Sequence, residues 1–279
     1  MLNTEDTNIS SQDYSAFCQF LERSCGIVLG RNKHYLVNSR LKRVLEEHHI
    51  ESIGKLLTKI GSDTGGQLYS QVIDAMTTNE TYWFRDNHPF KALKEHIFPA
   101  LIERKITRPR IWSAACSTGQ EAYTISMTVD EFLTARRGVF HDVEIVCTDI
   151  SPSVLQIAKA AKYDELSLSR GLTIEHRNRY FIQEDTGWRI KENIRSRARF
   201  SEINLKNSYA SLGKFHIVFC RNVLIYFSQD LKKDILNRIA DSLEPGGYLF
   251  LGGSESMASY CDRYNAVRHS NGLLYQVKK

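Results

Sequence analysis

Segments typical of strands alternate with segments typical of helices from Arg110 to the end of the chain. The strand-like segments are apolar runs: RIWSAA, VEIVCTDI, FHIVFCRNVLIYF, YLFLGG and GLLYQVKK. The helix-like segments between them are EAYTISMTVDEFLTAR, SPSVLQIAKAAKY and QDLKKDILNRIADSL. Strands of a parallel sheet show such continuous apolar runs because helices cover both faces of the sheet. The sequence therefore predicts a doubly wound α/β domain with a mostly parallel sheet over residues 110–279.

The chain before this domain has a helical pattern. From Ser11 to about Ser70, apolar residues recur every three or four positions, and glycines interrupt the pattern at Gly26, Gly30 and in SDTGG (62–66). This pattern predicts a small all-α domain over residues 1–75. A further segment, residues 76–109, holds TTNETYWFRD and the helical stretch FKALKEHIFPALIER, and we expect it to form a linker and a helix.

One segment of the α/β domain departs from the alternation. Over residues 172–203, aromatic side chains alternate with charged ones, and Asp185, Gly187 and Asn193 are turn signals. We therefore expect a small antiparallel β insertion there.

Composition and cysteine spacing limit the class of protein. The chain is 42% hydrophobic and 25% charged, as in globular proteins. Its net charge of +5 is smaller than the positive charge that nucleic-acid-binding proteins usually carry. Six scattered cysteines (Cys18, Cys25, Cys116, Cys147, Cys220 and Cys261) form no CxxC pair, so we expect reduced, buried thiols and no metal site. The start MLNTEDTNISSQDY does not resemble a signal peptide, and no apolar run is long enough to span a membrane. These features predict a cytoplasmic protein.

The segment AACSTGQEAYT, residues 114–124, joins the first predicted strand to a helix through small residues around Gly119. In open α/β sheets the ligand lies beyond the carboxyl ends of the strands, and a small-residue turn lets a nucleotide approach the backbone. The three-glycine fingerprint of dinucleotide-binding proteins is absent. Gly119 alone therefore also fits an ordinary strand-to-helix turn.

Two acidic residues support a cofactor site. Asp149 ends the second predicted strand, where a carboxylate can accept hydrogen bonds from both ribose hydroxyls. Asp149 in this position also fits a cap of the helix after Pro152, although Ser151 or Ser153 can do that. Glu121 stands at the start of the first helix, where it would repel a pyrophosphate but suit a cation. The pair therefore favours S-adenosylmethionine over NAD.

Four motifs together resemble the CheR family of chemotaxis receptor glutamate O-methyltransferases: TTNETYWFR (77–85), AACSTGQEAYT (114–124), CTDIS (147–151) and FCRNVLIYF (219–227). The resemblance extends over essentially the whole chain. It implies a Rossmann-like methyltransferase sheet with a small β insertion, preceded by a small all-α domain. It also implies transfer of a methyl group from S-adenosylmethionine to glutamate carboxylates, with S-adenosylhomocysteine as the product.

The resemblance assigns residues to the site as well. The implied cofactor contacts are Asn79, Thr81, Arg85, Glu121, Asp149, Asn204, Leu205, Arg221 and Asn222. Arg85 and Tyr226 would lie closest to the methyl group and act in catalysis; without the resemblance, they would be interpreted as a solvated arginine and a core tyrosine. Trp83 stands where the family commonly has phenylalanine.

The implied partner is the cytoplasmic helical domain of membrane chemoreceptors, with recruitment to receptor arrays, and neither nucleic-acid binding nor membrane insertion is expected. Arg40 and Arg43 lie three apart on a predicted basic helix, so we expect them to guide this substrate unless they form a solvated face. The β insertion would bind a receptor C-terminal tail peptide through Tyr180, Phe181 and Trp188, which could equally pack the insertion onto the sheet. Two other functions remain open: a methyltransferase for small molecules or nucleic acid, and a non-catalytic sensor of S-adenosylmethionine.

Overall fold

The computed structural model describes residues 9–62, 65–257, 260–269 and 272–278. Internal contacts divide the chain into two units, Met1–Thr78 with Tyr226–Ser228, and Asn79–Ile225 with Gln229–Lys279. The expectation that the chain starts without a signal peptide concerns residues 1–8 in particular, which lie outside the described residues. None of the described helices has the length and apolar character needed to cross a membrane.

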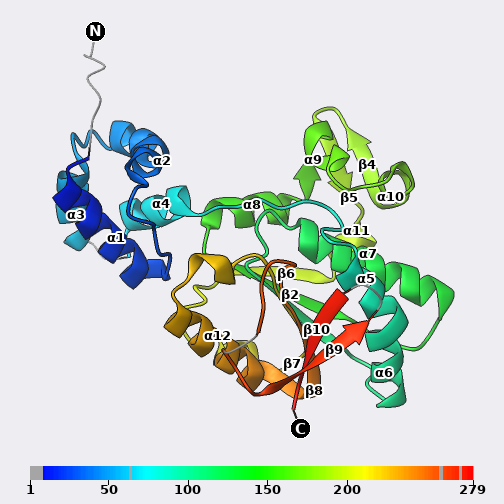
Figure 1. Ribbon diagram of the computed structural model, residues 1–279. Coiled ribbons are helices and arrows are strands. Elements are labelled where there is room, and N and C mark those ends of the chain that lie inside the picture. Colours follow the sequence, from blue (N-terminus) through cyan, green and yellow to red (C-terminus); the bar gives the residue numbers. More distant parts are fainter. Residues whose placement is uncertain (1–8, 63–64, 258–259, 270–271, 279) are drawn as a thin grey trace. The chain divides into compact units, whose positions relative to one another are not determined.

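The first unit is helical, as predicted (Figure 1). Its helices are α1 (Ser11–Cys25), α2 (His34–Glu47), α3 (Ile53–Gly61) and α4 (Gln67–Met76). Ser10 caps α1 by accepting a hydrogen bond from the Asp13 backbone N–H at 3.0 Å, and Gly26 ends the helix with a φ of 79°. Residues 226–228 belong to this unit because the Val28 backbone N–H donates to the Tyr226 carbonyl at 2.9 Å.

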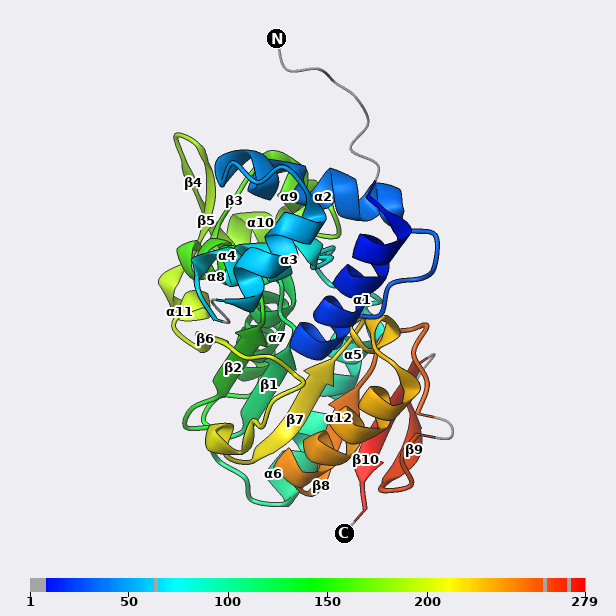
Figure 2. The ribbon, with the colours of Figure 1, turned by 90° about the vertical axis from the view of Figure 1, so that its left-hand side faces the viewer.

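The second unit is built on a seven-stranded sheet with the order β6-β2-β1-β7-β8-β10-β9 (Figures 1 and 2). The strands are β1 (Arg110–Ala114), β2 (Glu144–Asp149), β6 (Ala198–Glu202), β7 (Phe215–Cys220), β8 (Leu243–Phe250), β9 (Tyr264–His269) and β10 (Gly272–Val277). The strands from β6 to β8 run parallel, and β10 is antiparallel to both β8 and β9. The predicted α/β class and mostly parallel sheet are confirmed.

Helices pack on both faces of this sheet (Figure 2). The larger ones are α5 (His88–Ala92), α6 (Phe98–Glu103), α7 (Gln120–Ala135), α8 (Pro152–Ala160) and α12 (Gln229–Ser242), and a π-helix, Leu93–Ile97, joins α5 to α6. Ile111, Ile145 and Ile217 are paired across three neighbouring strands and belong to one buried core with the helices α5 to α8. Burial from both sides explains why these strands appear in the sequence as uninterrupted apolar runs.

The insertion is a three-stranded antiparallel sheet with the order β3-β5-β4. Its elements are β3 (Lys162–Tyr163), α9 (Glu165–Ser169), α10 (Ile174–Tyr180), β4 (Phe181–Glu184), β5 (Gly187–Ile190) and α11 (Glu192–Arg195). It starts before the predicted residue 172, and the last part of the predicted range, Ala198–Glu202, is strand β6 of the main sheet. β6 is an edge strand with exposed positions, so its alternating pattern resembles that of the insertion.

Two other segments differ from the expected elements. The apolar run FHIVFCRNVLIYF is a strand only as far as Cys220; Asn222 then has a φ of 58°, and Leu224–Tyr226 form a 3₁₀ turn. β9 was not predicted, because its sequence YNAVRH has exposed and charged positions at the edge of the sheet.

Candidate active site

The predicted cofactor residues follow four adjacent parallel strands. Asn204 and Leu205 come after β6, Asp149 ends β2, the Gly119 turn follows β1, and Arg221 and Asn222 follow β7. Because parallel strands share one carboxyl edge, the sheet brings these segments together along that edge.

The turn after β1 is shaped by its small residues. Ala115, Ser117 and Gly119 have positive φ values of 60°, 50° and 93°. A Cβ on Gly119 would lie 3.0 Å from the Ala158 Cβ and 3.1 Å from the Tyr163 hydroxyl oxygen, so only glycine fits without displacing its neighbours. The turn therefore opens α7 at the carboxyl edge, as its sequence predicted.

Asp149 organises the same turn. Its buried carboxylate accepts hydrogen bonds from the backbone N–H of Ser117 at 2.8 Å and of Ser151 at 3.0 Å. The cap of α8 is Ser151, whose hydroxyl accepts from the Val154 N–H at 3.3 Å. Asp149 is therefore not needed as a helix cap.

Glu121 takes part in a buried ion-pair network. It accepts from the Ser113 hydroxyl at 2.7 Å and from Arg221 at 2.9 Å. Arg221 also donates to the Asp86 carboxylate at 2.6 Å and to the Arg85 carbonyl at 2.8 Å. The Arg221 side chain is only 2% exposed, so this network fixes the linker, α7 and the end of β7 to one another.

The buried atoms at this edge that have no hydrogen-bond partner among the residues that the structure describes include the Arg221 Nε and the Asn222 Oδ1. Buried polar atoms of this kind call for a ligand or water. The Asn222 oxygen is an acceptor, which suits an amino group, and the carboxylates of Asp149 and Glu121 suit hydroxyl and cationic groups. The residues present therefore fit S-adenosylmethionine, which carries an α-amino group, a sulfonium and two ribose hydroxyls.

Glu255, in the loop after β8, is a residue of this edge that the sequence patterns did not predict. Its carboxylate accepts from the backbone N–H of Asn222 at 2.7 Å, of Gly252 at 2.7 Å and of Ile225 at 3.3 Å. A Cβ on Gly252 would lie 2.6 Å from the Asn222 Nδ2, so the two loops are in close contact. Glu255 therefore holds Asn222 in its left-handed conformation. The sequence signal that could have revealed it is GGSE, in which a turn of two glycines and a serine follows a buried strand and precedes an acidic residue.

The start of the second unit lies along the same edge. The Asn79 carbonyl accepts from the Ser117 hydroxyl at 2.8 Å. Trp83 is fully buried against the insertion, and its indole N–H donates to the Ser167 carbonyl at 3.1 Å. A Cβ on Gly171 would lie 2.1 Å from the Trp83 carbonyl oxygen. The tryptophan thus anchors the linker segment 79–85 on the insertion.

Arg85 is held by its own segment. Its guanidinium donates to the Glu80 carbonyl at 3.1 Å and lies 5.2 Å from the centroid of the Tyr82 ring. Thr81, beside them, is half-buried. Tyr226 falls in the first unit, with its carbonyl bonded to Val28, and its place near the methyl group stays a prediction.

Asn204 and Leu205 are held in the loop after β6. The Asn204 side-chain oxygen accepts from the Lys206 N–H at 3.0 Å, and the carbonyl of the buried Leu205 accepts from Arg238 at 2.9 Å. These bonds fix the loop beside the end of β2, where the Ile203 N–H donates to the Asp149 carbonyl at 2.9 Å.

The cysteines near this edge are unreactive because their thiols are buried. Cys116, Cys147 and Cys220 are fully buried, and burial raises the pKa of each thiol well above its usual value. None of the six cysteines, all of which the structure describes, forms a disulfide, and the two partly exposed ones are Cys18 and Cys261. The described residues hold no group of three or more His, Cys, Asp or Glu side chains able to bind a metal ion.

The two arginines expected to bind the substrate have different environments. Arg40 donates to the carbonyls of Met76 at 2.6 Å and Thr77 at 2.9 Å, and so caps the end of α4. Arg43 is 86% exposed and pairs with Glu47 one turn along α2 at 2.7 Å. Arg40 therefore has a structural role in the first unit, whereas the Arg43 side chain lies on the surface.

Comparison with known proteins identifies the family. A model described as "CheR methyltransferase, all-alpha domain" matches residues 12–77, and one described as "CheR methyltransferase, SAM binding domain" matches residues 79–272. The chain belongs to the CheR methyltransferase family. It therefore binds S-adenosylmethionine and is an S-adenosylmethionine-dependent methyltransferase.

Two CheR relatives are similar over their whole length. Chemotaxis protein methyltransferase 1 of Pseudomonas aeruginosa is 52% identical over 272 residues, which cover 96% of this chain and 99% of the relative. Chemotaxis protein methyltransferase 1 of Vibrio cholerae is 46% identical over 274 residues, which cover 97% and 98%.

Proposed function

We propose that this protein methylates glutamate side chains of chemotaxis receptors, forming glutamate methyl esters for sensory adaptation. The observation that carries the proposal is the match of both CheR domains, in a chain whose carboxyl edge holds Asp149, Glu121, Arg221 and Asn222 together. The names of the relatives, chemotaxis protein methyltransferases, support a role in chemotaxis.

Catalysis of this methyl transfer depends on positioning the reactants more than on proton transfer. A glutamate has an unperturbed pKa of about 4.3, so near neutral pH its side chain is already a nucleophilic carboxylate and needs no general base. S-adenosylmethionine supplies an electrophilic methyl group. Arg85 would orient the substrate carboxylate with its guanidinium fork, and a catalytic role for Tyr226 is proposed from the resemblance of its motif, FCRNVLIYF, alone. The carboxylate of Asp149 would bind the ribose hydroxyls, and the side-chain oxygen of Asn222 would accept from the amino group.

The receptor would bind in two places. We assign its cytoplasmic helical domain to the basic surface of α2 around Arg43, since acidic helices are attracted to exposed arginines. Its C-terminal tail would add a strand to β4, which pairs with β5 alone among the described strands and exposes 54% of Ile182. Tyr180 and Phe181 are buried and pack the insertion, so of the three expected aromatic contacts only Trp188 stays partly exposed.

Recruitment to receptor arrays belongs to the same proposal, since both contacts are made with the receptor. Matched variants separate these contacts from fold stability. We expect Arg43→Ala to raise the KM for receptor-containing membranes without changing the Tm, and Arg40→Ala to lower the Tm because the end of α4 loses its cap. Equal receptor kinetics for Arg43→Ala and wild type at physiological salt would remove α2 from the docking surface.

The test of the activity is transfer of radiolabelled methyl groups from S-adenosylmethionine to chemoreceptor-containing membranes, followed by mild base. Label released as methanol identifies a carboxyl methyl ester, and mass spectrometry of receptor peptides then identifies the glutamates. A base-stable product would instead indicate a small-molecule or nucleic-acid methyltransferase. Tight cofactor binding without any transfer would indicate a non-catalytic sensor.

A further inference from the structure

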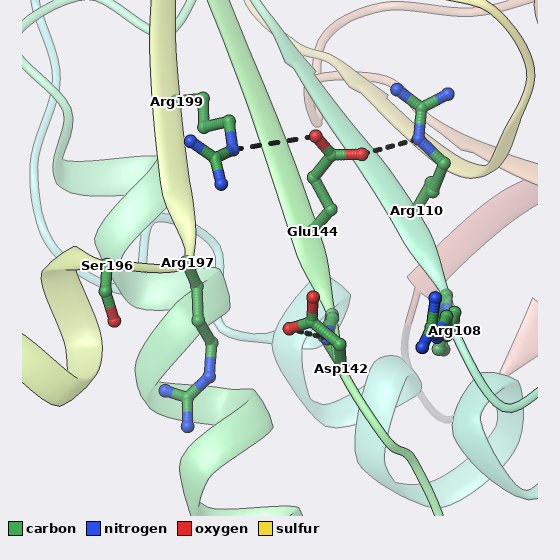
Figure 3. A pocket seen from close by; sticks show the side chains of 9 residues that line it. Arg108, Arg110, Asp142, Glu144, Ser196, Arg197 and Arg199 are labelled. Atoms are coloured by element: carbon green, nitrogen blue, oxygen red, sulfur yellow. Dashed lines mark hydrogen bonds and ion pairs between the residues drawn. The ribbon is translucent and has the colours of Figure 1, made fainter.

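The amino edge of the main sheet, opposite to the cofactor residues, carries a pocket of about 310 Å³ (Figure 3). It lies where β1, β2 and β6 begin. Its charged lining consists of four arginines and two acids: Arg108, Arg110, Arg197, Arg199, Asp142 and Glu144. Its volume is at the small end of the range for ligand pockets. None of these residues takes part in the site described above.

Strand register sets the arrangement of the charges. Arg110 of β1 is paired with Glu144 of β2, and Arg199 of β6 is paired with Val146, two residues after Glu144. Their side chains therefore project from one face of the sheet. Figure 3 shows the Glu144 carboxylate between the two guanidinium groups, 2.6 Å from the Arg110 Nε and 3.7 Å from the Arg199 Nε.

The guanidinium groups in the pocket are not equally engaged. Arg110 donates to Glu144 and also to two backbone carbonyls. Figure 3 shows the Arg197 side chain extending away from Glu144, and its guanidinium lies 3.7 Å from the Asp130 carboxylate of α7. Arg199 is 76% exposed, and its 3.7 Å contact with Glu144 is longer than a hydrogen bond. Arg108 has no hydrogen bond or ion pair to any residue that the structure describes. Two arginines of the lining thus keep their donors available to a ligand.

We propose that this pocket binds the phosphate group of a small phosphorylated molecule. A carboxylate is satisfied by a single guanidinium fork, whereas a phosphate monoester has three terminal oxygens that can accept from several arginines together. The four arginines exceed the two acids of the lining, which favours a dianion over a monoanion. Glu144 is the internal competitor of the ligand, because it occupies donors of Arg110 and Arg199 that a phosphate would use.

The experiment is calorimetric titration of the full-length protein with inorganic phosphate, pyrophosphate and glycerol 3-phosphate at constant ionic strength. We expect saturable binding that weakens at least about tenfold in the variant Arg108→Ala with Arg199→Ala, because charge-assisted hydrogen bonds are lost. Glu144→Gln should strengthen binding about threefold or more, because the competing charge is removed. Arg268→Ala, which removes an exposed arginine on β9 at the other end of the strand order, should leave the affinity unchanged.

Two further measurements distinguish this pocket from the cofactor site and a soluble phosphate ligand from a lipid headgroup. Binding should persist when S-adenosylhomocysteine saturates the protein, because the cofactor residues lie at the opposite edge of the sheet. Flotation with phosphatidylcholine vesicles, with and without phosphatidic acid, tests whether a lipid headgroup can supply the phosphate. The proposal is overturned by the absence of saturable binding, by equal affinity in the double variant, or by displacement with S-adenosylhomocysteine. None of these outcomes depends on whether the protein methylates receptors.

Discussion

The two edges of the main sheet carry the same kinds of side chain in different environments. At the carboxyl edge, Arg221 is 2% exposed and binds two carboxylates at 2.6 and 2.9 Å. At the amino edge, Arg199 is 76% exposed and approaches Glu144 only at 3.7 Å. Burial makes the first arginine part of the fold and leaves the second available to solvent or a ligand. The role of an arginine beside a carboxylate therefore depends on how exposed its side chain is, and the residue type alone does not reveal that exposure.

The largest effect should come from removing the buried arginine. Arg221→Ala leaves Glu121 and Asp86 without their cation, and we expect the free energy of unfolding to fall by about 3 kcal/mol or more. The matched change at the amino edge, Arg199→Ala, should cost less than about 1 kcal/mol. Urea denaturation of both variants measures the two values, and similar losses would show that burial does not distinguish the edges.

The next effect concerns cofactor affinity. Asp149→Asn replaces an acceptor of two backbone N–H groups by an amide, and we expect the Kd for S-adenosylmethionine to rise at least about tenfold. Asp142→Asn makes the same change at the amino edge, where the carboxylate accepts from the Val143 N–H at 2.8 Å, and should leave the Kd unchanged. Calorimetric titration of both variants with S-adenosylmethionine measures the two Kd values, and an unaltered Kd in Asp149→Asn would rule out the ribose assignment.

A smaller effect should follow from loosening Asn222. Glu255→Gln keeps the size of the side chain but weakens its bonds to the N–H groups of Asn222 and Gly252, and we expect the KM for S-adenosylmethionine to rise about threefold to tenfold. As Glu255 acts through Asn222, kcat at saturating cofactor should change less than the KM. Glu244→Gln, at the amino end of β8, is the control. A fall confined to kcat would contradict a positioning role.

The smallest effect should be on stability at the amino edge. Glu144→Gln removes a charge that is a third exposed, and we expect the free energy of unfolding to change by less than about 1 kcal/mol. Chemical denaturation beside the wild type measures it. A loss as large as that of Arg221→Ala would show that the amino edge is built as tightly as the carboxyl edge.

Much of the fold was predictable because its signals are local. The strands β1 and β2, the helix α7 and the cap at Ser151 follow from apolar runs, helical spacing and a serine before Pro152. The bounds of the insertion were less predictable, because the half-exposed edge strand β6 has an alternating pattern like that of an antiparallel strand.

The candidate site was predictable only in its parts. The motifs assigned Asp149, Glu121 and Arg221 to the candidate site, and in the structure these residues stand at the end of β2, in the first turn of α7 and directly after β7. Motifs did not reveal that Arg221 bonds to Asp86, that Glu255 holds Asn222, or that Trp83 anchors the linker on the insertion. These partners are far apart in the sequence, so no periodicity links them. The same holds for Arg40, whose guanidinium caps α4 instead of lying free on the basic face.

Local sequence patterns are enough to predict which segments form strands and helices, and which residues follow the carboxyl ends of the strands. Hydrophobic periodicity and turn chemistry act within a few residues, so they can be read along the chain. The tertiary structure alone decided which of the charged residues are buried in pairs and which remain open, because that depends on the strand order β6-β2-β1-β7 and on the register between neighbouring strands. Burial and distance then set the strength of each charge interaction, and with it the function that the residue can have.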